Sequence, residues 1–84
     1  MLPKEMDAGD IRENLDAWRV AALRSLDAGY EICEIHAAHG YLISQFLSPL
    51  ANRRSDEWGG SLANRARLLI EVVRAVREIG RAHV

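Results

Sequence analysis

The sequence contains a single β-rich run, Glu31–His36, and this run lies between two long helical patterns. Side chains alternate across such a run with period two, so Ile32 and His36 share one face and Cys33 lies on the other. A lone strand leaves its backbone donors and acceptors without partners and both of its faces uncovered. Helix–strand–helix is the repeating unit of a parallel α/β sheet or barrel. We therefore expect the chain to be one slice of a larger α/β fold.

The helical patterns on either side of this run have recognisable ends. The first pattern follows Asp7, a residue type that caps helix N-termini, and stops before Gly29, which suits a left-handed C′ position. The second follows Ser61, another N-cap residue type. The apolar stripe of the first helix comprises Ile11, Leu15, Trp18, Ala22 and Leu26, and that of the second comprises Leu62, Ala66, Leu69, Ile70, Val73 and Val76.

The segment between the β-rich run and the second helix contains two further elements. Gly40, four residues after the run, ends the strand signal, and we expect residues 41–46 to form a helical turn. Residues 52–60 are polar and charged and are closed by two glycines, so we expect an ordered loop there. Four charged residues of this loop are expected to hold it by ion pairs: Arg53, Arg54, Asp56 and Glu57.

Three polar rings, His36, His39 and Tyr41, lie within six positions where the run ends. A buried ring N–H or O–H must find a hydrogen-bond partner, so a strand interior rarely holds three such rings close together. At the C-terminal end of a strand, where the chain opens into a loop, such rings converge on a ligand. The sequence therefore predicts a ligand site at this strand end.

Charge and hydropathy exclude several classes of partner. The chain has 11 Lys and Arg residues against 12 Asp and Glu residues, which gives no basic footprint for nucleic acid or for an anionic membrane. No segment reaches the ~18 consecutive apolar residues of a membrane span, and residues 1–5 do not form a signal peptide. A lone Cys33 cannot form an internal disulfide. We therefore expect a cytoplasmic protein.

Several sequence blocks occur in a characteristic order: His-Ala-Ala-His-Gly-Tyr-Leu at 36–42, Gln-Phe-Leu-Ser-Pro at 45–49, Asn-Arg-Arg at 52–54, Asp-Glu-Trp-Gly-Gly-Ser at 56–61 and Asn-Arg at 64–65. Together they resemble the central signature of the Old Yellow Enzyme family. Members of that family are FMN-dependent NAD(P)H:flavin oxidoreductases, or ene-reductases, built on a (β/α)8 TIM barrel. The resemblance covers Pro3 to Glu78 and implies one helix–strand–loop–helix slice of such a barrel.

The resemblance also implies roles for the three rings. His36 and His39 correspond to residues that hydrogen-bond the carbonyl oxygen of an α,β-unsaturated substrate, an enone or quinone-like molecule lying over the flavin. Tyr41 corresponds to the candidate proton donor to the α-carbon. The implied cofactor is FMN, with NADH or NADPH as the reductant. Most FMN contacts are expected outside this chain, so no cofactor-binding residue is assigned within it, and no metal is expected.

Two alternatives from other classes remain open at this stage. A small metal-binding module would use Glu34, His36 and His39, although zinc requires three or four converging ligands and Cys33 lies on the opposite face of the run. An inactive interaction fragment is the second alternative. In the barrel reading, Glu34 would lie inside the barrel and would need a cation, which Arg54 or Arg65 could supply.

The C-terminal residues depart from the family pattern. We expect residues 1–78 to be a fragment of an FMN-binding TIM-barrel domain and residues 79–84, Ile-Gly-Arg-Ala-His-Val, to be a non-native tail. These six residues match what a widely used sequencing adapter encodes in one reading frame, so His83 is excluded from the fold reasoning. A single slice of a barrel is expected to be inactive in isolation, and oligomerisation is left open for the full-length protein.

Overall fold

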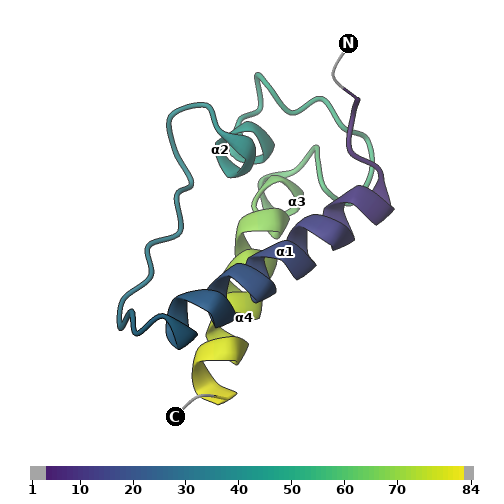
Figure 1. The fold of residues 1–84 in the computed structure, drawn as a ribbon. Helices are drawn as coiled ribbons and strands as arrows, with labels where there is room; N and C mark the ends of the chain where they lie inside the picture. The colour runs from purple at the N-terminus through teal and green to yellow at the C-terminus, as the bar shows by residue number, and fades with distance from the viewer. Residues whose placement is uncertain (1–3, 83–84) are drawn as a thin grey trace. The chain divides into compact units, whose positions relative to one another are not determined.

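The computed structural model describes residues 4–82, which contain four helices: α1 (Ala8–Asp27), α2 (Leu42–Leu47), α3 (Leu62–Arg65) and α4 (Arg67–Ala82) (Figure 1). The chain divides into two compact units. The first comprises residues 1–33 and 75–84, and the second comprises residues 34–74. Residues 1–3, at the start of the predicted fragment, and His83 of the predicted tail lie outside the described residues.

The predicted strand at Glu31–His36 is wrong for this chain. Residues 30–38 have no regular secondary structure and follow a coil from α1 to α2 (Figure 1), and no strand occurs anywhere in residues 4–82. The α/β character expected from the sequence is therefore not seen in the described part of the chain. The physical reason is that a strand is stabilised by the hydrogen-bonded ladder of a neighbouring strand, and this chain has a single β-rich run. Ile32 is accordingly 89% exposed.

The N-terminus of α1 confirms the predicted cap at Asp7. The backbone N–H of Asp10 donates to the Asp7 carboxylate at 2.8 Å, and the backbone N–H of Asp7 donates to the Asp10 carboxylate at 3.0 Å. This reciprocal pair is a capping box, which satisfies amide groups that the helix itself leaves without partners. The Asp10 amide, followed by the Lys4 ammonium, lowers the pKa of Asp7 from its ordinary value of 3.8.

The C-terminus of α1 confirms the predicted stop at Gly29. The backbone N–H of Gly29 donates to Leu26 at 3.0 Å and that of Tyr30 donates to Ser25 at 3.1 Å, which is the bonding pattern of a Schellman motif. Gly29 has φ = 93°, a conformation that a residue with a Cβ adopts only at a cost. The predicted stripe is also confirmed: Ile11 and Ala22 are buried, while Leu15, Trp18 and Leu26 are half-buried.

The second helical pattern differs from its prediction in two ways. The Ser61 side chain caps a helix as expected, accepting from the Asn64 backbone N–H at 3.2 Å, but a turn at Ala66 divides the pattern into α3 and α4. The buried residues of α4 are Leu68, Val72 and Ala75, whereas three members of the predicted stripe are exposed: Leu62, Ile70 and Val73. Apolar residues occupy two faces of this pattern, so periodicity alone selected the wrong face.

The predicted ordered loop at residues 52–60 is confirmed, and Asn52 holds it together. The Asn52 side-chain amide donates to the carbonyl oxygens of Phe46 at 2.7 Å and Trp58 at 2.9 Å, and its oxygen accepts from the Arg54 backbone N–H at 3.0 Å. Gly59 is buried, and it packs so closely on Asn52 that a Cβ at this position would lie 2.7 Å from the Asn52 side-chain oxygen. One side chain thus joins both ends of the loop to α2.

Arginine side chains reinforce the same loop. Arg54 contacts the Asp56 carboxylate through two nitrogens, at 3.0 and 2.6 Å, and its guanidinium lies 5.6 Å from the centre of the Phe46 ring. This ion pair confirms part of the predicted set, and the Arg54 guanidinium lowers the pKa of Asp56 from its ordinary value of 3.8. Arg65 donates to the carbonyl oxygens of Leu47 and Gly60, at 3.0 and 2.7 Å. The loop is held mainly by side chains bonded to backbone carbonyls.

Candidate functional site

The three rings singled out in the sequence lie together in the second unit. The ring centres of His36 and His39 are 5.6 Å apart, and those of His36 and Tyr41 are 5.3 Å apart. The planes are tilted by 36° and 53°, so the rings are neither stacked nor parallel. All three side chains are exposed, Tyr41 to 63%. We call this group the ring cluster; its polar atoms are open to a ligand.

A tight turn brings the rings together. The Tyr41 backbone N–H donates to Ala38 at 3.4 Å, and the two central residues both have positive φ, 59° at His39 and 76° at Gly40. Two consecutive positive φ values are what a type I′ turn requires. Glycine adopts this conformation freely, and histidine is among the residues that tolerate it better than most. His39 thus has its place in the cluster through a backbone conformation that few side chains accept.

Two side chains of α2 hold this turn. The Gly40 backbone N–H donates to the Ser44 hydroxyl oxygen at 3.3 Å, and the Gln45 side-chain amide donates to the Gly40 carbonyl oxygen at 2.8 Å. Tyr41 is the N-cap residue of α2 and its side chain makes no capping hydrogen bond. The sequence analysis assigned no role to Ser44 or to Gln45, although Gln45 begins the block at 45–49. Two polar residues in the first turn of a predicted helix, just after a glycine, are the pattern that would have indicated them.

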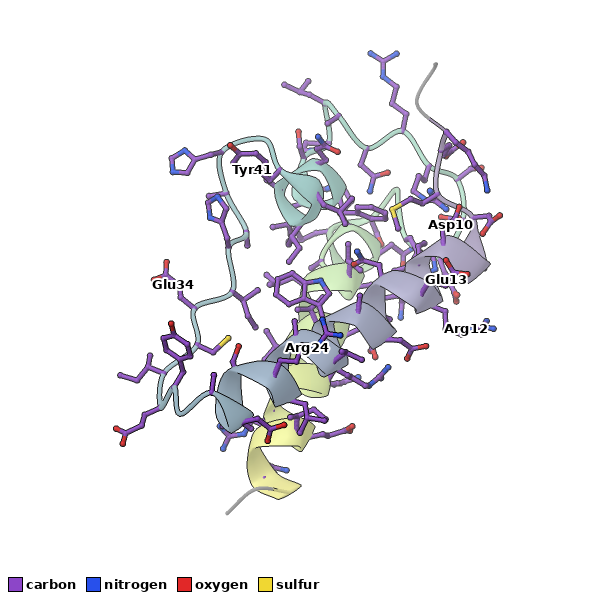
Figure 2. All side chains as sticks on the ribbon, viewed as in Figure 1. Asp10, Arg12, Glu13, Arg24, Glu34 and Tyr41 are labelled. Atoms are coloured by element: carbon purple, nitrogen blue, oxygen red, sulfur yellow. The ribbon has the colours of Figure 1, made fainter. Side chains whose placement is uncertain are left out.

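Glu34 is exposed in this chain, whereas the barrel interpretation places it inside a barrel. Figure 2 shows Glu34 further back along the coil that leads to Tyr41, and its side chain is exposed. The two arginines proposed as its partners bond elsewhere: Arg54 pairs with Asp56, and Arg65 donates to backbone carbonyls. An exposed carboxylate is solvated by water, so it needs no cation. The expectation of a buried Glu34 rested on the strand that this chain does not form.

Neither a metal centre nor a membrane span is found in the part of the chain that the structure describes. Residues 4–82 contain no group of three or more His, Cys, Asp or Glu side chains that could hold a metal ion. The set required by the metal-binding alternative, Glu34, His36 and His39, is therefore not gathered. Within the same residues, no helix is both long enough and apolar enough to cross a bilayer.

A separate pocket of about 140 Å³ lies in the first unit. It is lined by residues from the C-terminal half of α1, the coil that follows and α4: Ala22, Ser25, Leu26, Tyr30, Glu31, Ile32, Cys33, Val76 and Gly80. None of the three rings is among these residues. The ring cluster is thus an open surface and not the wall of this pocket.

Comparison with known proteins identifies the class to which this chain belongs. The sequence profile of the NADH:flavin oxidoreductase / NADH oxidase family matches residues 1–84. The chain belongs to this family. It is 57% identical over 77 residues to an NADPH dehydrogenase of Geobacillus sp. (strain WCH70) and 56% identical over 77 residues to one of Clostridium acetobutylicum. Each alignment covers 92% of this chain and 23% of the relative, so the chain spans under a quarter of their length.

Solved structures show the same relationship. Morphinone reductase in complex with tetrahydroNAD matches with a TM-score of 0.89 and 43% identity, covering 92% of this chain and 21% of that protein. A 2-naphthoyl-CoA reductase in complex with 2-naphthoyl-CoA matches with a TM-score of 0.87 and 45% identity, covering 89% of this chain and 11% of that protein. The resemblance to Old Yellow Enzymes is thereby confirmed, and it implies FMN as the cofactor with NAD(P)H as the reductant.

The residues of this chain suit one side of a flavin site. The ring cluster offers N–H and O–H groups that can bind a carbonyl oxygen above a planar cofactor. A phosphate needs free backbone N–H groups or a cation, but Asp7 and Asp10 already occupy amides at the N-terminus of α1. Arg54 is paired with Asp56. The α1 N-terminus and Arg54 are thus both engaged within this chain.

Proposed function

We propose that this chain is the substrate-binding segment of an FMN-dependent NAD(P)H oxidoreductase that reduces the C=C bond of α,β-unsaturated carbonyl compounds. The observation that carries the proposal is the ring cluster, in which the ring centre of His36 lies 5.6 Å from that of His39 and 5.3 Å from that of Tyr41. The family match supports the oxidoreductase chemistry, and the names of the related reductases support a small-molecule substrate.

His36 and His39 bind the substrate carbonyl oxygen in this proposal. Each imidazole has at least one N–H donor in either protonation state, so the pair can place two donors on one oxygen. Negative charge builds up on that oxygen as the C=C bond is reduced, and donors held in place for that charge lower the barrier. Removing one such donor typically costs a few kcal/mol of transition-state stabilisation, about 10²- to 10³-fold in rate.

Tyr41 donates the proton that completes the reduction. FMN, when bound and reduced, would supply the hydride that adds to the β-carbon. The Tyr41 O–H then gives its proton to the α-carbon, so one hydride and one proton saturate the C=C bond. The phenol O–H of a tyrosine is a proton and hydrogen-bond donor. Since Tyr41 is 63% exposed, its phenolate can regain a proton from solvent.

The fold proposed for the whole protein is a (β/α)8 barrel, of which residues 1–78 form one helix–strand–loop–helix slice. In the barrel, Glu31–His36 would pair with neighbouring strands and the ring cluster would stand at the C-terminal end of its strand, where barrel enzymes place their active sites. The isolated chain is inactive in this proposal because it lacks most of the cofactor site. Residues 79–84 as a non-native tail, a cytoplasmic location and the oligomeric state stay predictions.

Ligand binding by single variants of the FMN-loaded full-length protein tests the proposal. We expect His36→Ala or His39→Ala to weaken binding of 2-cyclohexenone by roughly tenfold to a hundredfold, because each loses a hydrogen bond worth about 1.5–3 kcal/mol. Glu34→Ala, on the same coil, is the control and should bind normally. A metal-binding module predicts instead that all three variants lose stoichiometric zinc. Unchanged enone affinity in both histidine variants would refute the proposal.

A further inference from the structure

We propose that Ser44 and Gln45 are positioning residues, which set the place of the ring cluster by fixing the backbone of Gly40. This inference rests on the proposed function for what the cluster binds. The contacts that carry it do not depend on that function. Ser44 and Gln45 are both in the first turns of α2 (Leu42–Leu47), and neither is one of the three rings.

Both polar backbone atoms of Gly40 are held by these two side chains. Its N–H donates to the Ser44 hydroxyl oxygen at 3.3 Å, and its carbonyl oxygen accepts from the Gln45 amide at 2.8 Å. The hydrogen bond within the turn itself, from the Tyr41 N–H to the Ala38 carbonyl oxygen, is longer at 3.4 Å. The Gln45 bond is therefore the one of ordinary length at this turn, and the Ser44 bond and the turn's own backbone bond are both long.

The turn needs such support because of its backbone conformation. His39 has φ = 59°, a region that residues with a Cβ rarely adopt, and Gly40 follows at 76°. His39 and Tyr41 are the two neighbours of Gly40 along the chain. A change in the Gly40 backbone therefore moves the His39 ring relative to the Tyr41 ring. With Gly40 held at both polar atoms, the two rings keep the separation from His36 that the structure records.

Removal of the Ser44 hydroxyl or of the Gln45 amide should both loosen the turn and weaken ligand binding. Ser44→Ala removes the acceptor of the Gly40 N–H, and Gln45→Met removes the donor to its carbonyl oxygen while keeping a chain of similar length. The loss of one net hydrogen bond corresponds to about a two- to tenfold change. We therefore expect faster hydrogen exchange of the Gly40 amide and weaker 2-cyclohexenone binding, each by about that factor per variant.

Matched variants separate a local effect from general destabilisation. Ser25→Ala removes a hydroxyl that donates to the Ala21 carbonyl oxygen at 2.9 Å in α1, far from the ring cluster in sequence, and it should change neither readout. Gln45→Lys restores an N–H donor and should recover part of the affinity that Gln45→Met loses. Reduction of the flavin by NADPH should be unchanged in all variants, since the turn acts on the substrate.

The experiment is hydrogen exchange of the peptide covering residues 37–43, together with equilibrium binding of 2-cyclohexenone to the FMN-loaded full-length protein. Coupled increases in exchange rate and dissociation constant in Ser44→Ala and Gln45→Met support the inference. Unchanged exchange in these two variants overturns the inference. Faster exchange with unchanged affinity also overturns it, when His36→Ala does weaken binding. If His36→Ala and His39→Ala also leave the affinity unchanged, the proposed function is refuted. Hydrogen exchange needs no flavin, so it would still show whether α2 fixes the turn.

Discussion

Two neighbouring stretches of the second unit differ in what holds them. The loop at residues 52–60 is fixed by its own surroundings, with the Asn52 side chain bonded to two carbonyl oxygens and Arg54 paired with Asp56. The coil that enters this unit at Glu34 and continues to Ala38 has no regular structure until the turn at His39. A stretch bonded by its own side chains is therefore ordered locally, whereas a β-rich stretch depends on a neighbouring strand.

The largest expected effect concerns chemistry at the end of the coil. Tyr41→Phe keeps the ring and removes the proton donor, so we expect enone turnover to fall by about 10²- to 10⁴-fold, the usual contribution of a positioned general acid. Flavin reduction by NADPH should stay near normal. Stopped-flow measurement of the two half-reactions separates these steps.

Tyr30→Phe is the matched control for this change. Tyr30 is similarly exposed, at 68% compared with 63% for Tyr41, and it belongs to the first unit. Its substitution should leave both half-reactions unchanged. Reoxidation by an enone at the parental rate in Tyr41→Phe would mean that water or another group supplies the proton, and Tyr41 would then be a wall of the site.

The next effect concerns the stability of the loop. Asn52→Ala removes three hydrogen bonds and leaves two partly buried carbonyl oxygens without their donor. We expect the free energy of unfolding of the full-length protein to fall by roughly 2–4 kcal/mol, at about 1 kcal/mol for each bond with an added cost for the orphaned groups. Denaturant titration measures this change.

Asn14→Ala provides the comparison within the same residue type. Asn14 lies in α1, and its side-chain oxygen is buried without a hydrogen-bond partner. Its replacement should raise the free energy of unfolding or leave it unchanged, because alanine has the higher helix propensity and the substitution removes a buried oxygen that has no partner. Equal losses in the two asparagine variants would show that the loop does not depend on the Asn52 bonds.

The smallest expected effect is an acid transition at the start of α1. The pKa of Asp7 is lowered in the folded chain by the Asp10 amide and by Lys4, from an ordinary value of 3.8. Its contribution to stability is therefore complete above pH 3.8 and is lost as the pH falls through the lower folded value. NMR titration of the Asp7 carboxyl measures this shift. Asp7→Asn should remove this acid dependence at the helix start, whereas Asp27→Asn, at the opposite end of α1, should leave it unchanged.

The features that were predictable from the sequence are those set by neighbouring residues. The capping box at Asp7, the stop at Gly29 and the cap at Ser61 all follow from side chains within a few positions of a helix end. The ring cluster belongs to the same category, since its three residues lie within six positions. Local patterns therefore gave both the helix ends and the residues of the candidate site.

Features that depend on distant contacts were not predictable from the sequence. The strand at Glu31–His36 was predicted from residue types that favour β-structure, but such types form a strand only beside a partner. The buried face of α4 was missed because both Val72 and Val73 are apolar and only Val72 is buried. Ser44 and Gln45 were missed because their importance depends on the hydrogen bonds that they make to the backbone of Gly40.

The central claim is that residues 31–36 belong to a larger flavoprotein and are a strand only there. Hydrogen exchange of these amides, compared between the 84-residue chain and the FMN-loaded full-length protein, tests it most directly. We predict exchange at the rate of unstructured peptide in the short chain and strong protection in the full-length protein, because the neighbouring strands would then accept and donate the missing bonds. Equal protection of these amides in the two proteins would contradict the account.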